Sequence, residues 1–182
     1  MYLTVRRDEN EGFVLEMSSP LFHYLHLLPA KMRAYLDAPD YESRALRRLF
    51  PPGYSDPDKE DEYRELVRGD LLQQRREKVD SFEELLTGGT VSVGEASLQI
   101  PADRFDACLT FLNDLRVLVG EELEIEDEEW DRDFDPADPR ADQVLMLHLL
   151  GTIQQGLLEA TGMVDIDIRP EDIDPSGRDD VE

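Results

Sequence analysis

The stretch that most constrains the fold of this chain runs from Pro101 to Leu123, PADRFDACLTFLNDLRVLVGEEL. At 100° per residue its apolar side chains cover roughly half of a helix circumference or more, which is wider than the stripe of an ordinary surface helix. They are Phe105, Cys108, Leu109, Phe111, Leu112, Leu115, Leu118, Val119 and Leu123. The pattern therefore predicts a central helix, around which the other elements pack.

One charged residue, Arg116, falls inside this apolar arc, with Asn113 at its border and Asp114 directed away. A guanidinium that faces the core needs a partner to compensate for its lost hydration. On a second long helix, Asp70 and Gln74 interrupt the apolar stripe in the same way. We therefore expect Asp70 and Arg116 to form a buried salt bridge, with Gln74 or Asn113 completing a polar network. The alternative is that Arg116 binds an anionic ligand or a partner's carboxylate.

The remaining elements follow from their hydrophobic periods and their Pro and Gly boundaries. Alternating residues on either side of DENEG predict a β-hairpin over residues 3–17, and residues 91–100 predict one or two further strands. Helices are expected over residues 19–36, where Pro29 should kink or divide the helix, and over residues 43–50, 57–86, 101–123 and 139–161.

The predicted fold class is α+β, predominantly α-helical: a helical bundle around the central helix with a small antiparallel β-sheet. Residues 1–162 are expected to form a single mainly helical domain. Residues 163–182 mix acidic residues with Pro and Gly and have no sustained period, which predicts an acidic, disordered tail. Within that tail, VDIDI is the one segment that could add an edge strand.

The charge of the chain excludes several functions. With 43 acidic and 19 basic residues the net charge is -24, whereas binding to phosphate backbones requires clustered Lys and Arg. We therefore expect no direct nucleic-acid binding and no binding to anionic membranes, and no apolar run is long enough to span a bilayer. The one basic cluster, Arg44, Arg47 and Arg48, is interpreted as a solvated face that offsets the excess of acidic residues. A single cysteine, Cys108, allows no intrachain disulfide and favours a cytoplasmic location.

Residues 121–138 form an acidic segment that contains Trp130 and Phe134. One interpretation is a partner-binding segment, in which these aromatic residues anchor a protein while the acids steer a basic partner. A solvated loop is the plainer alternative. A calcium loop over Asp131, Asp133, Asp135 and Asp142 is disfavoured, because proline stands where the turn needs glycine and the last position is Asp rather than Glu.

The sequence contains no nucleophile elbow, Walker loop, dinucleotide fingerprint or His pair with Glu at helical spacing. Cys108 has no basic neighbour within a helical turn to stabilise a thiolate and is expected in the core. We therefore predict a non-enzymatic protein with no cofactor and no metal.

Three blocks of the sequence resemble a known bacterial family. They are LRRLFPPGYSD over 46–56, EYRELVRGDLL over 62–72 and FLNDLRVLVGEEL over 111–123. In this order they are similar to the family catalogued as domain of unknown function twenty-seventeen (AosR-like, oxidative-stress regulators), and the resemblance covers about residues 1–160. It implies a regulatory role with a protein partner, in the transcription or proteolysis machinery. The resemblance also implies a Cys-x-x-x-Cys pair for redox sensing, as in the oxidative-stress regulators of that family. This pair is absent here, because Cys108 is the single cysteine.

Two functional hypotheses follow. The first is a cytoplasmic, non-enzymatic regulatory protein that binds another protein, in transcription or stress control. The alternative is a small-ligand-binding protein or an undetected enzyme that uses the polar cluster of Asp70, Asn113 and Arg116.

Overall fold

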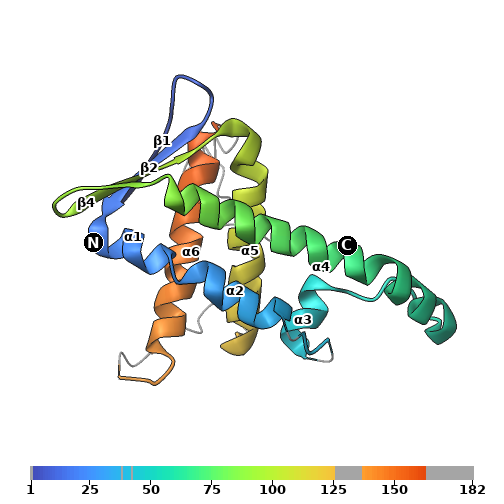
Figure 1. The fold of residues 1–182 in the computed structure, drawn as a ribbon. Helices are drawn as coiled ribbons and strands as arrows, with labels where there is room; N and C mark the ends of the chain where they lie inside the picture. The colour runs from blue at the N-terminus through green and yellow to red at the C-terminus, as the bar shows by residue number, and fades with distance from the viewer. Residues whose placement is uncertain (1, 38, 42, 126–136, 163–182) are drawn as a thin grey trace, which may run out of the picture.

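The computed structural model describes residues 2–37, 39–41, 43–125 and 137–162. Helices and one small sheet are arranged as an α+β fold that is predominantly helical, which confirms the predicted class (Figure 1). In chain order the elements are β1 (Leu3–Arg7), β2 (Phe13–Ser18), α1 (Ser19–Leu25), α2 (Leu28–Asp37), α3 (Arg44–Leu49), α4 (Pro57–Thr87), β3 (Thr90–Val91), β4 (Glu95–Ile100), the 3-10 turn η1 (Ala102–Arg104), α5 (Phe105–Glu122) and α6 (Ala141–Ala160).

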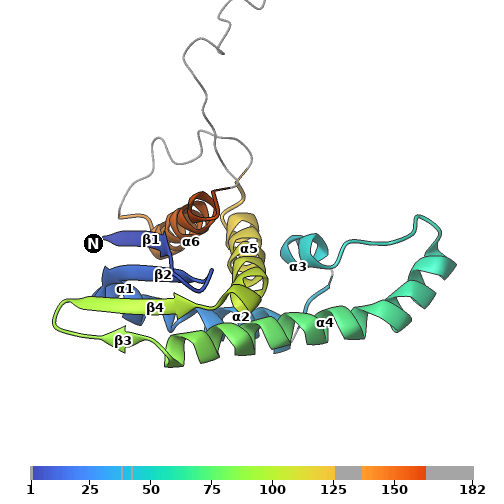
Figure 2. The same cartoon turned by 90° about the horizontal axis from the view of Figure 1, so that it is seen from above.

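The predicted hairpin and the predicted later strands join in one antiparallel sheet of order β1-β2-β4-β3. In β2, Leu15 pairs with Val5 of β1 and with Leu98 of β4. Side chains alternate between the two faces of a strand, so Leu15 and Met17 are buried under the helices while Glu16 faces solvent. The views in Figures 1 and 2 place the helices on one side of the sheet.

The predicted central helix is confirmed as η1 and α5. The α5 helix contacts α3, α4 and α6, so most of its circumference is covered by other helices. Phe111 of α5 stacks on Phe82 of α4 with ring centroids 4.3 Å apart. Cys108 is buried in the same core, as predicted. A helix enclosed on several sides has a wide apolar arc, which explains the sequence pattern.

Helix ends follow the local sequence signals. The predicted break near Pro29 is confirmed, because α1 ends at Leu25 and α2 begins at Leu28. Ser43 caps α3 by accepting a hydrogen bond from the Leu46 amide (3.3 Å). Asp56 likewise caps α4. Among the described residues, no helix is both long and apolar enough to cross a lipid bilayer.

The α4 helix is much longer than the body on which it packs. Its 31 residues span about 46 Å at 1.5 Å per residue. Its C-terminal part is anchored by buried Val79, Phe82, Leu85 and Leu86, whereas the one buried side chain among residues 57–70 is Glu60. We call residues 57–70 the α4 arm. Figure 2 shows it projecting past α3.

Candidate protein-binding surfaces

The predicted buried network of Asp70, Gln74, Asn113 and Arg116 is wrong, because all four residues are exposed. Arg116 donates a hydrogen bond from Nη1 to Gln154 Oε1 of α6 (3.2 Å). Asp114, which was predicted to point away from the core, is 6% exposed. The error has a physical cause: α5 is covered by several helices, so the centre of its apolar arc does not mark the face toward α4.

A largely buried ion pair does join α4 and α5, with the charges reversed relative to the prediction. Arg75 of α4 lies with Nε 3.2 Å from Asp114 Oδ2, within ion-pair distance although Nε makes no hydrogen bond. Arg75 also donates to the Leu49 carbonyl (2.7 Å) and lies over the Phe50 ring. Burial raises the pKa of the Asp114 carboxyl, and attraction to Arg75 and Lys78 offsets this only in part. Arg75 of α4 therefore contacts both α3, at Leu49, and α5, at Asp114.

The sequence contains a signal for this pair that the prediction missed. Arg75 follows Leu71 by four residues and precedes Val79 by four, so all three share one helical face. Val79 is fully buried. A helical wheel centred on Val79 and Phe82 would have placed Arg75, rather than Asp70, in the interface.

The start of the α4 arm is tied to the preceding turn by one carboxylate. Glu60 Oε2 accepts hydrogen bonds from the amides of Gly53 (2.8 Å) and Tyr54 (2.9 Å), and Oε1 accepts one from Arg64 Nε (2.6 Å). Hydrogen bonds from the Tyr54 amide, Arg64 and the Gly53 amide lower the pKa of the Glu60 carboxyl. We call this arrangement the Glu60 clasp. It fixes the position of Tyr54 relative to the arm.

The clasp presents an apolar surface at the exposed end of the molecule. Tyr54 meets the ring of Tyr63 edge-on, with centroids 5.8 Å apart. Leu66, one turn further along α4, is 69% exposed. Together they border a hollow of about 560 Å³, lined by Tyr54, Lys59, Glu62, Tyr63, Leu66 and Val67. We call these six residues the arm patch.

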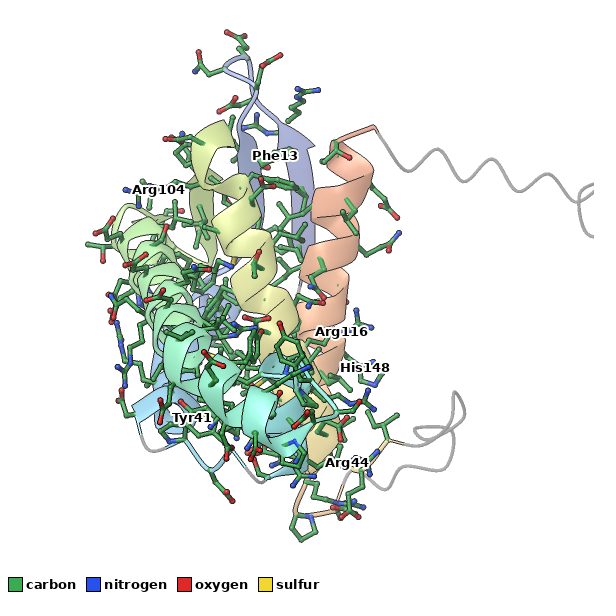
Figure 3. All side chains as sticks on the ribbon, turned by 90° about the vertical axis from the view of Figure 1, so that its right-hand side faces the viewer. Phe13, Tyr41, Arg44, Arg104, Arg116 and His148 are labelled. Atoms are coloured by element: carbon green, nitrogen blue, oxygen red, sulfur yellow. The ribbon has the colours of Figure 1, made fainter. Side chains whose placement is uncertain are left out.

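A second concavity lies on the other side of the molecule, between β1 and α6. It has a volume of about 970 Å³, and its lining includes Arg116 and Gly151. Arg116 also lines a smaller hollow of about 390 Å³ between α5 and α6, this time together with Asn113, whereas Asp70 lines neither concavity. The polar cluster proposed from the sequence is thus reduced to Asn113 and Arg116. Figure 3 shows Arg116 near His148 beside α6.

Several predictions concern residues that the structure does not describe. Trp130 and Phe134 of the acidic segment lie outside the described residues, as do Asp131, Asp133 and Asp135 of the disfavoured calcium loop and the whole of 163–182. Within the described ranges there is no group of three or more side chains able to hold a metal ion. In the predicted basic cluster, Arg44 and Arg48 both pair with Glu121 of α5.

The fold and its surfaces define a mainly helical α+β domain with an arm patch and a concavity between β1 and α6. The family model described as domain of unknown function (DUF2017) matches residues 4–161, and the chain belongs to this family. No curated protein and no solved structure matches the chain.

Proposed function

We propose that this chain is a non-enzymatic, cytoplasmic regulatory protein that binds another protein through the α4 arm, in transcription or stress control. The observation that carries the proposal is the exposure of Leu66 within the arm patch. An apolar side chain that is exposed in the free protein is removed from water when a partner covers it, and this burial favours binding. A cytoplasmic location accords with the single cysteine, Cys108, which is free and buried.

The construction of the arm supports a docking role. The Glu60 clasp fixes the backbone of Tyr54, whose ring meets that of Tyr63 edge-on, and tyrosines held in this way bury a large area at low conformational cost. The helix itself is anchored in the core beyond Val79, so the arm patch is presented on a pre-ordered element.

Charge indicates the kind of partner. Residues 57–70 contain six acidic and three basic residues, and two of the basic side chains are engaged within the protein: Arg64 with Glu60, and Arg68 over the Tyr41 ring. An apolar patch in an acidic setting favours a partner that offers apolar side chains among Lys and Arg, because opposite charges speed encounter and disfavour wrong partners. The proposed partner is therefore a basic amphipathic segment.

The experiment compares capture of cell proteins by the immobilised full chain and by two variants. Leu66→Glu places a charge in the arm patch. Leu145→Glu is the matched control, because Leu145 is also an exposed leucine on a helix and lies outside the patch. We expect a partner retained by the wild type and by Leu145→Glu but lost with Leu66→Glu. Its affinity should fall as salt is raised toward 1 M, where the screening length is about 3 Å.

Two results would contradict this proposal. If no protein is enriched over the Leu66→Glu sample, the arm patch does not bind a partner. If Trp130→Ala or Phe134→Ala abolishes capture while Leu66→Glu does not, the interaction role stands but docking is through the acidic segment instead of the arm.

A further inference from the structure

The groove between β1 and α6 borders the edge of β1 that faces away from β2. Ser18 donates to the Tyr2 carbonyl (3.2 Å) and Asp8 to the Gly12 carbonyl (2.9 Å), which marks these as hydrogen-bonded pairs of the β1–β2 ladder. In an antiparallel ladder such pairs recur at every second residue, so the N–H and C=O groups of Leu3 and Val5 point away from β2. In the described part of the chain no other strand pairs with this edge of β1.

Helix α6 lies close beside that edge because of its small residues. A Cβ atom on Gly156 would come within 2.7 Å of Val5 Cγ2, so only glycine permits this approach. One and a half turns earlier, Gly151 lies beneath the guanidinium of Arg116, whose Cζ is 3.8 Å from the position of a Cβ there. The result is the β1–α6 groove, lined by Leu3, Thr4, Val5, Arg116, Leu147, His148, Gly151, Thr152, Gln155, Gly156, Glu159 and Ala160.

Arg116 lacks a carboxylate partner among the described residues. Other arginines of this acidic protein pair with acids, for example Arg33 with Glu83 (2.6 Å) and Arg104 with Glu84 (2.8 Å). Arg116 instead contacts the neutral amide of Gln154. A guanidinium that lines a groove and has donors left over is suited to a carboxylate, which it can bind through two parallel hydrogen bonds.

The groove has a polarity that selects one direction for a bound strand. β1 and α6 run in the same sense, toward the hairpin turn (Figure 1). Glu159 lies at the hairpin end of the groove, whereas Arg116 is at Gly151, about 7.5 Å before Gly156 along α6. A strand antiparallel to β1 would run from the acidic end to the cationic end. Its C-terminus would then reach Arg116, whereas a parallel strand would bring an N-terminal amine there.

We propose that the β1–α6 groove binds the C-terminal segment of another protein as an extended strand, antiparallel to β1, with its terminal carboxylate on Arg116. The backbone of Leu3 and Val5 supplies hydrogen bonds that do not depend on sequence, and Arg116 recognises the end of the chain. This site is separate from the arm patch and does not rest on the function proposed above.

The test uses the full chain and a random library of eight-residue peptides with free carboxyl termini. Selected peptides are then measured by fluorescence anisotropy as free acids and as C-terminal amides. We expect amidation to weaken binding at least tenfold, and Arg116→Gln to do the same. Both changes together should weaken it no more than either alone, because they remove the same contact. Arg104→Gln is the matched control and should change nothing.

Two further measurements test the strand. Bound peptide should slow amide exchange at Leu3 and Val5 but not at Thr4, whose amide faces β2. Thr152→Trp fills the groove and should abolish binding, whereas Thr87→Trp should not. Thr152 and Thr87 are both exposed helical threonines that bond the carbonyl four residues earlier, so the two variants are matched.

The proposal is overturned if the library yields no binder, or if the selected peptides bind equally well as amides or to Arg116→Gln. It is also overturned if peptides bind without slowing exchange at Leu3 and Val5. Slow exchange at these amides in the peptide-free full chain would show that the edge is already covered, by a segment of this chain or by a second copy. None of these results bears on Leu66, so this site and the arm patch fail or stand separately.

Discussion

Removal of Arg75 should destabilise the fold far more than removal of the acid with which it pairs. Arg75→Met leaves the Asp114 carboxylate, 6% exposed, without its ion-pair partner and with only the weaker attraction of Lys78. An uncompensated buried charge of this kind costs about 3–5 kcal/mol. Asp114→Asn should stay within about 1 kcal/mol of the wild type, because the lost attraction is offset by the relief of carboxylate desolvation. Arg75 then keeps the Leu49 carbonyl and the Phe50 ring.

The asymmetry comes from the environment of each group. The Arg75 side chain is 17% exposed, donates to the Leu49 carbonyl and lies over the Phe50 ring. For Asp114, by contrast, burial is the largest influence on the pKa of the carboxyl. Adding Asp114→Asn to Arg75→Met should therefore restore most of the loss, since the double variant holds no unpaired charge. Arg76→Met is the matched control: this neighbour is 40% exposed, pairs with Asp37, and should cost less than about 1 kcal/mol.

Urea unfolding followed by circular dichroism measures these free energies, and its pH dependence supplies an independent check. The pKa of Asp114 is raised in the folded state above its ordinary 3.8. As the pH falls, the folded protein therefore binds a proton at Asp114 at a higher pH than the unfolded chain does. Relative to Asp114→Asn, the wild type should gain stability as the pH falls through the raised pKa, with the gain complete below 3.8. Equal costs for the two single variants, or no recovery in the double variant, would refute the reasoning.

Three further outcomes are expected. Gly156→Ala should lower the free energy of unfolding in urea by about 1–3 kcal/mol, because the new Cβ would meet Val5. Gly69→Ala, where no atom lies within 4 Å of the new Cβ, should raise it by about 0.5–1 kcal/mol, and changes of the same sign would contradict the packing argument. Cys108, whose pKa burial raises to about 12, should react with a thiol-specific alkylating reagent only when the protein unfolds, and rapid labelling of the native protein would place it elsewhere. Because the pKa of Glu60 is lowered on folding, the Glu60 clasp stabilises the folded state at pH values above the ordinary 4.5, and this stabilisation is lost as the pH falls through the lowered pKa. Glu60→Gln should speed hydrogen exchange of the Gly53 and Tyr54 amides at pH 7, and unchanged exchange would argue against the clasp.

The arrangement of elements along the chain could be predicted because its signals are local. The alternation around DENEG, the prolines at 20, 29 and 57, and the glycines at 88 and 89 each act within a turn or two of backbone. The width of the apolar arc around Phe111 also identified α5 as central, since burial on several sides leaves few polar positions. The family resemblance was likewise local, in three short blocks, and the match over residues 4–161 confirms it.

Which helix faces which side of α5 was decided by the tertiary structure alone. A helical wheel gives directions around one axis, but it does not say where the neighbouring helices lie, so Arg116 was assigned to the interface with α4 and Asp114 to solvent. Packing reversed both: Asp114 meets Arg75, and Arg116 reaches α6 where Gly151 leaves room. The projection of the α4 arm past α3 depends in the same way on where the other elements lie, and so does the absence, among the described residues, of a strand on the outer edge of β1. Such features arise from contacts between segments far apart in the sequence, and no local pattern encodes them.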